Sequence, residues 1–263
     1  MSVQQANPAS PAGTIGATAA SPTRLGVDAP TRMFHALFAF SFFGAWLSAE
    51  TERLRLVHVT LGYTMAGLLV FRILYGLFGP RQARLGLLWQ RLRAARSWWR
   101  DARRAPDLMS VPWRRALPVL VGLSIATALL ATVPLVLSGY ASYQDWGDVI
   151  GGDLFEELHE ALGEGVLNLV LLHLFAVLAL SLSMKRNLAM QMVHGRIPGR
   201  GPDPVRRNRR WLAASMLVAV LGFWAWQWQQ APQLSPGAPG RAYPPVSKIW
   251  PGSAADHPVR ARS

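Results

Sequence analysis

Hydrophobic residues along the chain fall into long blocks that polar segments separate. Five blocks lie at about 33–49, 56–78, 116–137, 155–183 and 211–228, and each is between 17 and 29 residues long. A soluble helix keeps a polar face, whereas a helix of about twenty apolar residues can cross a bilayer. The pattern therefore predicts an all-α integral membrane fold. We expect a four-helix transmembrane bundle followed by a fifth, C-terminal transmembrane helix.

The remaining segments predict the organisation around these helices. Residues 1–31 are rich in Ala, Ser, Pro, Gly and Thr and lack the apolar run of a signal peptide, so we expect a disordered cytoplasmic segment. Residues 32–200 form the main membrane domain, in which 85–99 predicts an amphipathic helix at the membrane surface. Residues 201–228 combine a basic linker with the fifth helix, and 229–263 form a Pro/Gly-rich periplasmic tail.

The distribution of charge predicts the orientation of the helices. The formal net charge is +13, and Lys and Arg gather in 81–115 and 185–210, whereas 138–153 contains neither. The positive-inside rule then predicts a multi-pass protein of the bacterial inner membrane, with a cytoplasmic N-terminus and a periplasmic C-terminus. A basic chain also suggests nucleic acid as a partner. Because the arginines flank membrane blocks, we expect lipid contact and no nucleic acid.

Four histidines lie in or beside the first, second and fourth blocks: His35, His58, His159 and His173. His159 and His173 are fourteen residues apart. On an α-helix this spacing puts them on nearly one face, about 21 Å apart along the axis. In a hydrocarbon layer of about 30 Å, one ring then lies near each leaflet.

The predicted helix directions divide these histidines into two pairs by depth. His35 and His173 lie on the cytoplasmic side, and His58 and His159 lie on the periplasmic side. Two neutral imidazoles can serve as the axial ligands of one haem iron. We therefore predict two b haems, bound non-covalently because the chain has no cysteine for a c-type attachment. Zinc fits less well, since each pair offers only two protein ligands.

Other residues and another interpretation accompany this prediction. Arg72 lies inside the second block, where a charge needs a partner, and a propionate of the cytoplasmic haem or a lipid phosphate fits that need. His194 and His257 are expected to be ordinary surface residues. The alternative is a haem-free helical scaffold or transporter, in which the histidines only pack helices together.

Four stretches resemble the bacterial cytochrome b561 family, which includes the b-type cytochromes of nickel–iron hydrogenases. They are TRMFH (31–35), RLVHVTLGYTMAGLLVFRILYGLFGP (55–80), LHEALGEGVLNLVLLH (158–173) and MKRNLAMQMVHGR (184–196). The resemblance covers about 31–200, so the fifth helix and the tail lie outside it. It implies a four-helix core that binds two b haems, with ligands at His35, His58, His159 and His173.

The resemblance also implies quinone-linked electron transfer across the inner membrane, as part of a respiratory chain. We expect electrons to pass between the quinone pool and a periplasmic partner, such as a c-type cytochrome or a dehydrogenase or hydrogenase subunit. Two forms of this function stay open. The chain is either an electron-transfer cytochrome with quinol oxidoreductase activity of its own, or the cytochrome b anchor subunit of a hydrogenase or dehydrogenase complex.

Overall fold

The structure, a computed structural model, describes residues 22–80, 84, 86–107, 109–110, 113–146 and 153–230. Five long helices dominate it: α1 (Ala29–Ser48), α2 (Arg55–Phe78), α4 (Trp113–Tyr143), α6 (Leu154–Ser183) and α8 (Arg210–Gln230). The shorter elements are β1 (Thr23–Leu25), the 3-10 turn η1 (Glu52–Leu54), α3 (Gly86–Arg104), α7 (Met190–His194) and β2 (Arg196–Pro198).

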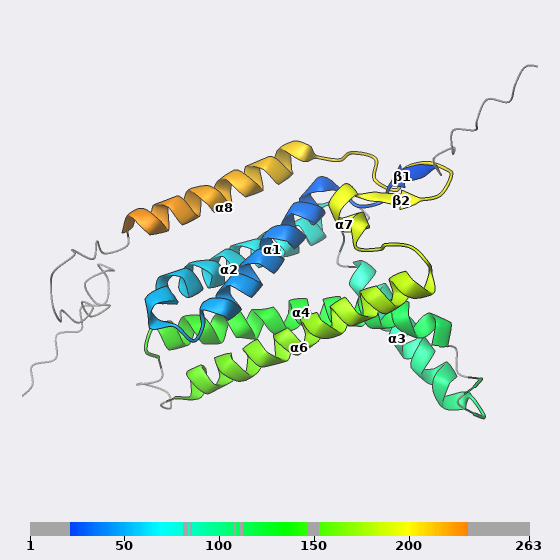
Figure 1. The fold of residues 1–263 in the computed structure, drawn as a ribbon, viewed down its shortest axis with the longest axis horizontal. Coiled ribbons are helices and arrows are strands. Elements are labelled where there is room, and N and C mark those ends of the chain that lie inside the picture. Colours follow the sequence, from blue (N-terminus) through cyan, green and yellow to red (C-terminus); the bar gives the residue numbers. More distant parts are fainter. Residues whose placement is uncertain are drawn as a thin grey trace, which may run out of the picture.

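The long helices form two packed pairs with α8 on the outside. Helices α4 and α6 lie side by side along most of their length, and α1 and α2 form a second pair that crosses them (Figure 1). Helix α8 packs against α1 and α2 on the side away from α4 and α6. Successive long helices run in opposite directions, so the bundle has two ends that differ in their connections.

Apolar side chains from different helices meet in two clusters inside this bundle. One joins α1, α2 and α8 through Phe34, Leu37, Leu68, Met216 and Val220. The other joins α1, α2, α4 and α6 through Phe42, Met65, Leu135 and Val166. Helix α1 therefore contributes to both clusters and connects α8 to the other three long helices. Between membrane helices, such clusters stabilise the bundle through close van der Waals packing.

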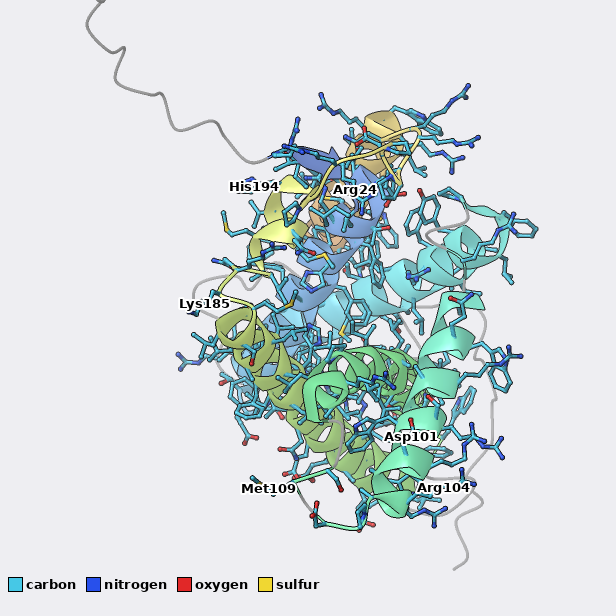
Figure 2. All side chains as sticks on the ribbon, turned by 90° about the vertical axis from the view of Figure 1, so that its right-hand side faces the viewer. Arg24, Asp101, Arg104, Met109, Lys185 and His194 are labelled. Atoms are coloured by element: carbon cyan, nitrogen blue, oxygen red, sulfur yellow. The ribbon has the colours of Figure 1, made fainter. Side chains whose placement is uncertain are left out.

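One end of the bundle, called the basic end below, gathers the start of α1, the end of α6 and the start of α8. Strands β1 and β2 pair antiparallel there, with Leu25 opposite Arg196. The carbonyl of Gly195 accepts hydrogen bonds from the main-chain N–H groups of Gly26 and Val27 at 2.8 and 3.1 Å. Gly195 has φ +73°, which glycine adopts without a steric penalty. Seen face-on, this end carries many nitrogen-tipped side chains (Figure 2).

A buried carboxylate connects three helices at the basic end. Asp28, at 1% exposure, caps α1 by accepting a hydrogen bond from the main-chain N–H of Thr31. Its other oxygen accepts a hydrogen bond from the Tyr75 hydroxyl of α2. The guanidinium carbon of Arg209 lies 6.0 Å from the centre of the Tyr75 ring, just before α8 begins. These contacts fix the end of α2 against both neighbouring helices.

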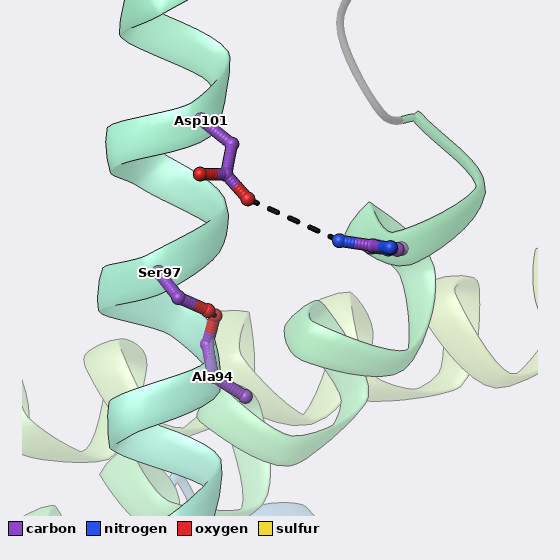
Figure 3. A network of polar contacts seen from close by, with 4 residues as sticks. Ala94, Ser97 and Asp101 are labelled. Carbon is purple, nitrogen blue, oxygen red and sulfur yellow. Dashed lines mark hydrogen bonds and ion pairs between the residues drawn. The ribbon is translucent and has the colours of Figure 1, made fainter.

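The amphipathic helix α3 leads into α4 at the same end of the bundle (Figure 1). An ion pair joins them, with Asp101 Oδ2 3.9 Å from Arg115 Nη1 (Figure 3). Both side chains are exposed, so the pair contributes little to stability. Between the helices, hydrogen bonds from the Ser110 side chain and main chain lower the pKa of the Asp107 carboxyl. Asp107 and Ser110 are thus linked to each other, and Arg93, Arg96 and Arg100 of α3 are exposed.

Four helical segments are long and apolar enough to cross a membrane: Glu52–Phe78, Arg115–Tyr143, Leu154–Ser183 and Arg210–Gln230. Many large apolar side chains on them face outward, such as Phe175 at 62% and Leu182 at 69% exposure. A contiguous apolar surface of this kind suits lipid, not water. Helix α1, predicted as the first membrane helix, is not among the four segments.

The observed helices agree with most predicted blocks and correct several limits. Helices α2, α6 and α8 lie within two residues of the predicted bounds at each end. Helix α1 begins at Ala29, and β1 precedes it, so the end of the segment predicted as disordered (1–31) is folded. Helix α4 (Trp113–Tyr143) extends beyond the predicted block at 116–137 at both ends. The predicted tail, apart from its first two residues, lies outside the described residues.

Candidate functional site

Two histidine rings meet at the end of the bundle opposite the basic end. His58 lies in the first turn of α2, and His159 lies in the second turn of α6. Both helices begin at this end (Figure 1), so the fold brings together rings that are 101 residues apart in the sequence. The ring centroids are 5.9 Å apart and the planes make an angle of 79°. The approach of His58 and His159, predicted from helix directions, is therefore present in the structure.

Each of these rings is held by a main-chain carbonyl of a neighbouring helix. His58 Nδ1 lies 2.8 Å from the oxygen of Ala45 in α1, and His159 Nδ1 lies 2.9 Å from the oxygen of Leu135 in α4. A carbonyl can only accept a hydrogen bond, so Nδ1 must carry the proton in both rings. Nε2 of each ring is then left with a lone pair that can bind a metal ion.

Glycines leave room beside both rings. A Cβ on Gly139 of α4 would lie 2.6 Å from Cε1 of His159, so only glycine permits this ring position. One helical turn after each histidine stands another glycine, Gly62 after His58 and Gly163 after His159. A Cβ on Gly62 would meet nothing within 4 Å, and one on Gly163 would meet only Leu135 Cδ1 at 4.0 Å. Each helix surface is therefore open at the glycine one turn after its histidine.

The donor set and its spacing fit an axial pair on one haem iron. An imidazole nitrogen binds a first-row metal ion at about 2 Å, so two rings on opposite sides of one ion have centroids about 6 Å apart. The observed separation is 5.9 Å. Both rings are half-buried, and hydrogen bonding of Nδ1 to a carbonyl is the usual outer contact of a ligating histidine. The open space beside the glycines suits a flat macrocycle.

The second predicted pair, His35 and His173, lies on α1 and α6. His173 lies on α6, fourteen residues after His159, with its Nδ1 3.4 Å from Ser124 Oγ of α4. His35 lies in the second turn of α1 and is exposed. Both belong to the halves of their helices that point to the basic end. The pairing of His35 with His173 stays a prediction.

The other sequence candidates lie apart from the paired rings. Arg72 is half-buried in the second half of α2, toward the basic end, and its contact with a propionate stays a prediction. His194 ends α7 and is exposed, as expected for a surface residue. His257 lies outside the described residues. Within the described part of the chain, no three His, Asp or Glu side chains converge as metal ligands.

Helix α4 supplies contacts that the sequence analysis missed. It contains no histidine, yet its Leu135 carbonyl and Gly139 both touch the ring of His159. Ser138 Oγ lies 3.5 Å from His159 Nδ1 as well. A backbone carbonyl cannot be recognised in a sequence. Ser138 and Gly139, a polar and a small residue within an apolar run, were the signal that this part of α4 contacts another group.

A family profile described as prokaryotic cytochrome b561 matches residues 26–195, well over half of the chain. The match covers α1 to α7 and ends before α8, so it confirms the resemblance seen in the motifs and, like that resemblance, leaves out the C-terminal helix. No curated protein and no solved structure matches the chain.

Proposed function

Because this chain belongs to the prokaryotic cytochrome b561 family, whose members are membrane b-type cytochromes of electron transfer, we propose that it carries two b haems. In this proposal it passes electrons across the bacterial inner membrane, between the quinone pool and a periplasmic redox partner. His58 and His159 hold one haem, called the outer haem, and His35 and His173 hold the other, the inner haem.

One observation carries the proposal. The rings of His58 and His159 oppose each other at 5.9 Å, and each Nδ1 donates to a carbonyl of a different helix. Histidines that only pack helices need one hydrogen-bond partner, and these rings already have it on Nδ1. The lone pair of Nε2 on each ring, in an apolar bundle, then calls for a further partner. A metal centre between the rings satisfies both nitrogens at once.

The residues around the outer haem have separable roles. A bound b haem supplies a one-electron iron couple, whose potential depends on its axial ligands and their hydrogen bonds. Ala45 and Leu135 orient the two imidazoles and fix their tautomer through the carbonyl contacts. Gly139 allows the ring of His159 to approach α4, and Gly62 and Gly163 keep space beside the rings.

Two haems held fourteen residues apart on α6 divide the membrane into shorter electron-transfer steps. The axial distance between His159 and His173 is about 21 Å for a straight helix. The hydrocarbon layer is about 30 Å thick, so each haem lies near one surface. Arg72 lies toward the basic end, where its guanidinium can pair with a propionate of the inner haem. Helix α6 is then the shared support of both sites.

The proposed topology has five membrane-spanning helices, with α1 included. Helix α1 packs in both apolar clusters, so it cannot leave the bundle without exposing them. The connectors of the basic end hold most Lys and Arg residues, which favours the cytoplasmic side for this end (Figure 2). The outer haem then faces the periplasm, and α8 ends there.

Reduction by a quinol tests this function. The purified chain is placed in phospholipid nanodiscs, oxidised, and mixed with a reduced ubiquinone or menaquinone analogue. We expect b-type α-bands to appear in the absorption spectrum, and His194→Ala to behave as the unchanged protein. Haem that no quinol reduces would contradict the quinone part of the proposal. Isolation from native membranes separates the two forms of the function, since an anchor subunit co-purifies with a stoichiometric periplasmic subunit.

A further inference from the structure

We propose that α4, which carries no ligand, positions both α6 histidines through two buried serines, Ser138 and Ser124. Ser138 Oγ lies 3.5 Å from His159 Nδ1, and Ser124 Oγ lies 3.4 Å from His173 Nδ1. This inference rests on the proposed function, because it assumes that both histidines bind haem iron. It adds two positioning residues on a helix to which the sequence analysis gave no role at the haems.

A single helix register produces both contacts. Ser124 and Ser138 are fourteen residues apart on α4, as His159 and His173 are on α6. The two helices are antiparallel and packed along most of their length (Figure 1). Opposite chain directions therefore place Ser138 beside His159 and Ser124 beside His173. The spacing of the serines matches the spacing of the ligands, so one interface serves both haem sites.

Each serine makes the same local hydrogen bond, which aims its oxygen at the histidine. Ser138 Oγ donates to the Leu135 carbonyl at 3.1 Å, and Ser124 Oγ donates to the Val121 carbonyl at 3.0 Å. With its proton directed at the backbone, each hydroxyl oxygen can accept from Nδ1. At His159 the serine is a second, longer acceptor at 3.5 Å beside the Leu135 carbonyl at 2.9 Å, whereas at His173 the serine lies 3.4 Å from Nδ1. Their exposures are 3% and 2%, so water does not compete for these lone pairs.

Helix α1 has a related contact near His58. Ser48 Oγ lies 2.7 Å from the Gly44 carbonyl and 3.0 Å from the Ala45 carbonyl, and the Ala45 carbonyl also accepts from His58 Nδ1. Ser48 is 3% exposed. Ser48 and His58 thus share one carbonyl acceptor, as Ser138 and His159 share the Leu135 carbonyl.

The serines act on the ligands and not on the iron directly. Hydrogen-bond acceptors at Nδ1 raise the basicity of a ligating imidazole and hold its orientation. A more basic ligand favours the oxidised metal, so the serine oxygen lowers the midpoint potential of the haem that its histidine binds. Ser138 and Ser124 therefore tune the outer and the inner haem separately.

Spectroscopic redox titration of Ser138→Ala and Ser124→Ala tests the inference. We expect Ser138→Ala to raise the potential of the outer haem only, and Ser124→Ala to raise that of the inner haem only. Both variants should retain two haems. The His58→Ala variant, which should lack the outer haem, assigns the two components. Ser215→Ala is the matched control, because Ser215 makes the same bond to the Leu212 carbonyl with no histidine beside it.

The outcomes separate this inference from the proposed function. Equal shifts at both haems, or shifts no larger than that of Ser215→Ala, would overturn the role of α4 while the haems remain. Absence of haem from the unchanged protein would overturn the proposed function first. If an alanine variant does not fold, Ser138→Thr and Ser124→Thr replace it, since threonine keeps the hydroxyl. These variants should retain the potentials of the unchanged protein, and a site-specific rise in them would contradict the inference.

Discussion

The rings of His58 and His159 lie with their centroids 5.9 Å apart and their planes at 79°, and each is oriented by a helix other than its own. The carbonyl of Ala45 in α1 accepts from His58 of α2, and the carbonyl of Leu135 in α4 accepts from His159 of α6. All four helices therefore contribute to one pair of rings. A change on α1 or α4 can alter the site without touching a ligand.

Removing either ring of the pair should remove the same haem. Iron held by two axial imidazoles loses its low-spin coordination when one is missing. We expect His58→Ala, His159→Ala and the double variant each to retain one haem per chain, measured by pyridine haemochrome assay. His194→Ala serves as the control and should retain two. A double variant with less haem than either single variant would show that the two histidines belong to different sites.

Gly139→Ala should disturb the outer haem selectively. The new Cβ would lie 2.6 Å from Cε1 of His159, which forces the ring or α4 to move. Overpacking of this kind costs about 1–3 kcal/mol in a packed core. We expect the outer haem to lose low-spin character in the absorption or EPR spectrum, while the inner haem is unchanged. Gly222→Ala is the control, since its Cβ meets nothing within 4 Å; equal spectra for both variants would refute the prediction.

Gly195→Ala should loosen the basic end without affecting the haems. Gly195 has φ +73°, and a Cβ there would lie 2.6 Å from the Val27 carbonyl oxygen. The left-handed conformation alone costs a non-glycine residue about 1–2 kcal/mol. We expect thermal unfolding of the detergent-solubilised protein about 2–8 °C lower, at about 2–4 °C per kcal/mol. Gly86→Ala, with open space at its Cβ, should leave the transition in place. An unchanged transition in Gly195→Ala would argue against the β1–β2 closure.

Tyr75→Phe should destabilise the junction of α1, α2 and α8. The substitution removes the hydroxyl that donates to Asp28, whose side chain is 1% exposed. A buried acceptor that loses its donor costs about 1–3 kcal/mol. We expect faster proteolysis at the basic end and a lower unfolding temperature. Tyr140→Phe, on α4, is the control. Restoration of stability by the further change Asp28→Asn would support the explanation, and equal stability of the two Tyr variants would contradict it.

The membrane helices could be predicted from sequence because lipid imposes a simple pattern. The block at 155–183 corresponds to α6 (Leu154–Ser183), and its histidine spacing follows from helix geometry alone. The meeting of His58 with His159 also followed, because charge bias gave each helix a direction. The depth of each histidine in the membrane was enough to predict that pair.

The contacts between helices could not be predicted in the same way. The acceptors of His58 and His159 are main-chain carbonyls, which every residue has. Helix α4 runs past Ser138 to Tyr143, beyond the predicted apolar block at 116–137, and the Ser138 side chain bonds back to the Leu135 carbonyl inside it. Strands β1 and β2 have three residues each, which is too short to show the alternating polar and apolar pattern of a strand. They pair across more than 170 residues, so nothing local in the sequence predicts their contact.

Haem content of the purified, full-length chain tests the central claim most directly. A pyridine haemochrome assay combined with protein quantification gives the number of b haems per chain. The account predicts two, with the α-band of haem b in the reduced spectrum. A well-folded preparation that contains no haem would contradict it, and would favour a helical membrane scaffold in which His58 and His159 only pack α2 against α6.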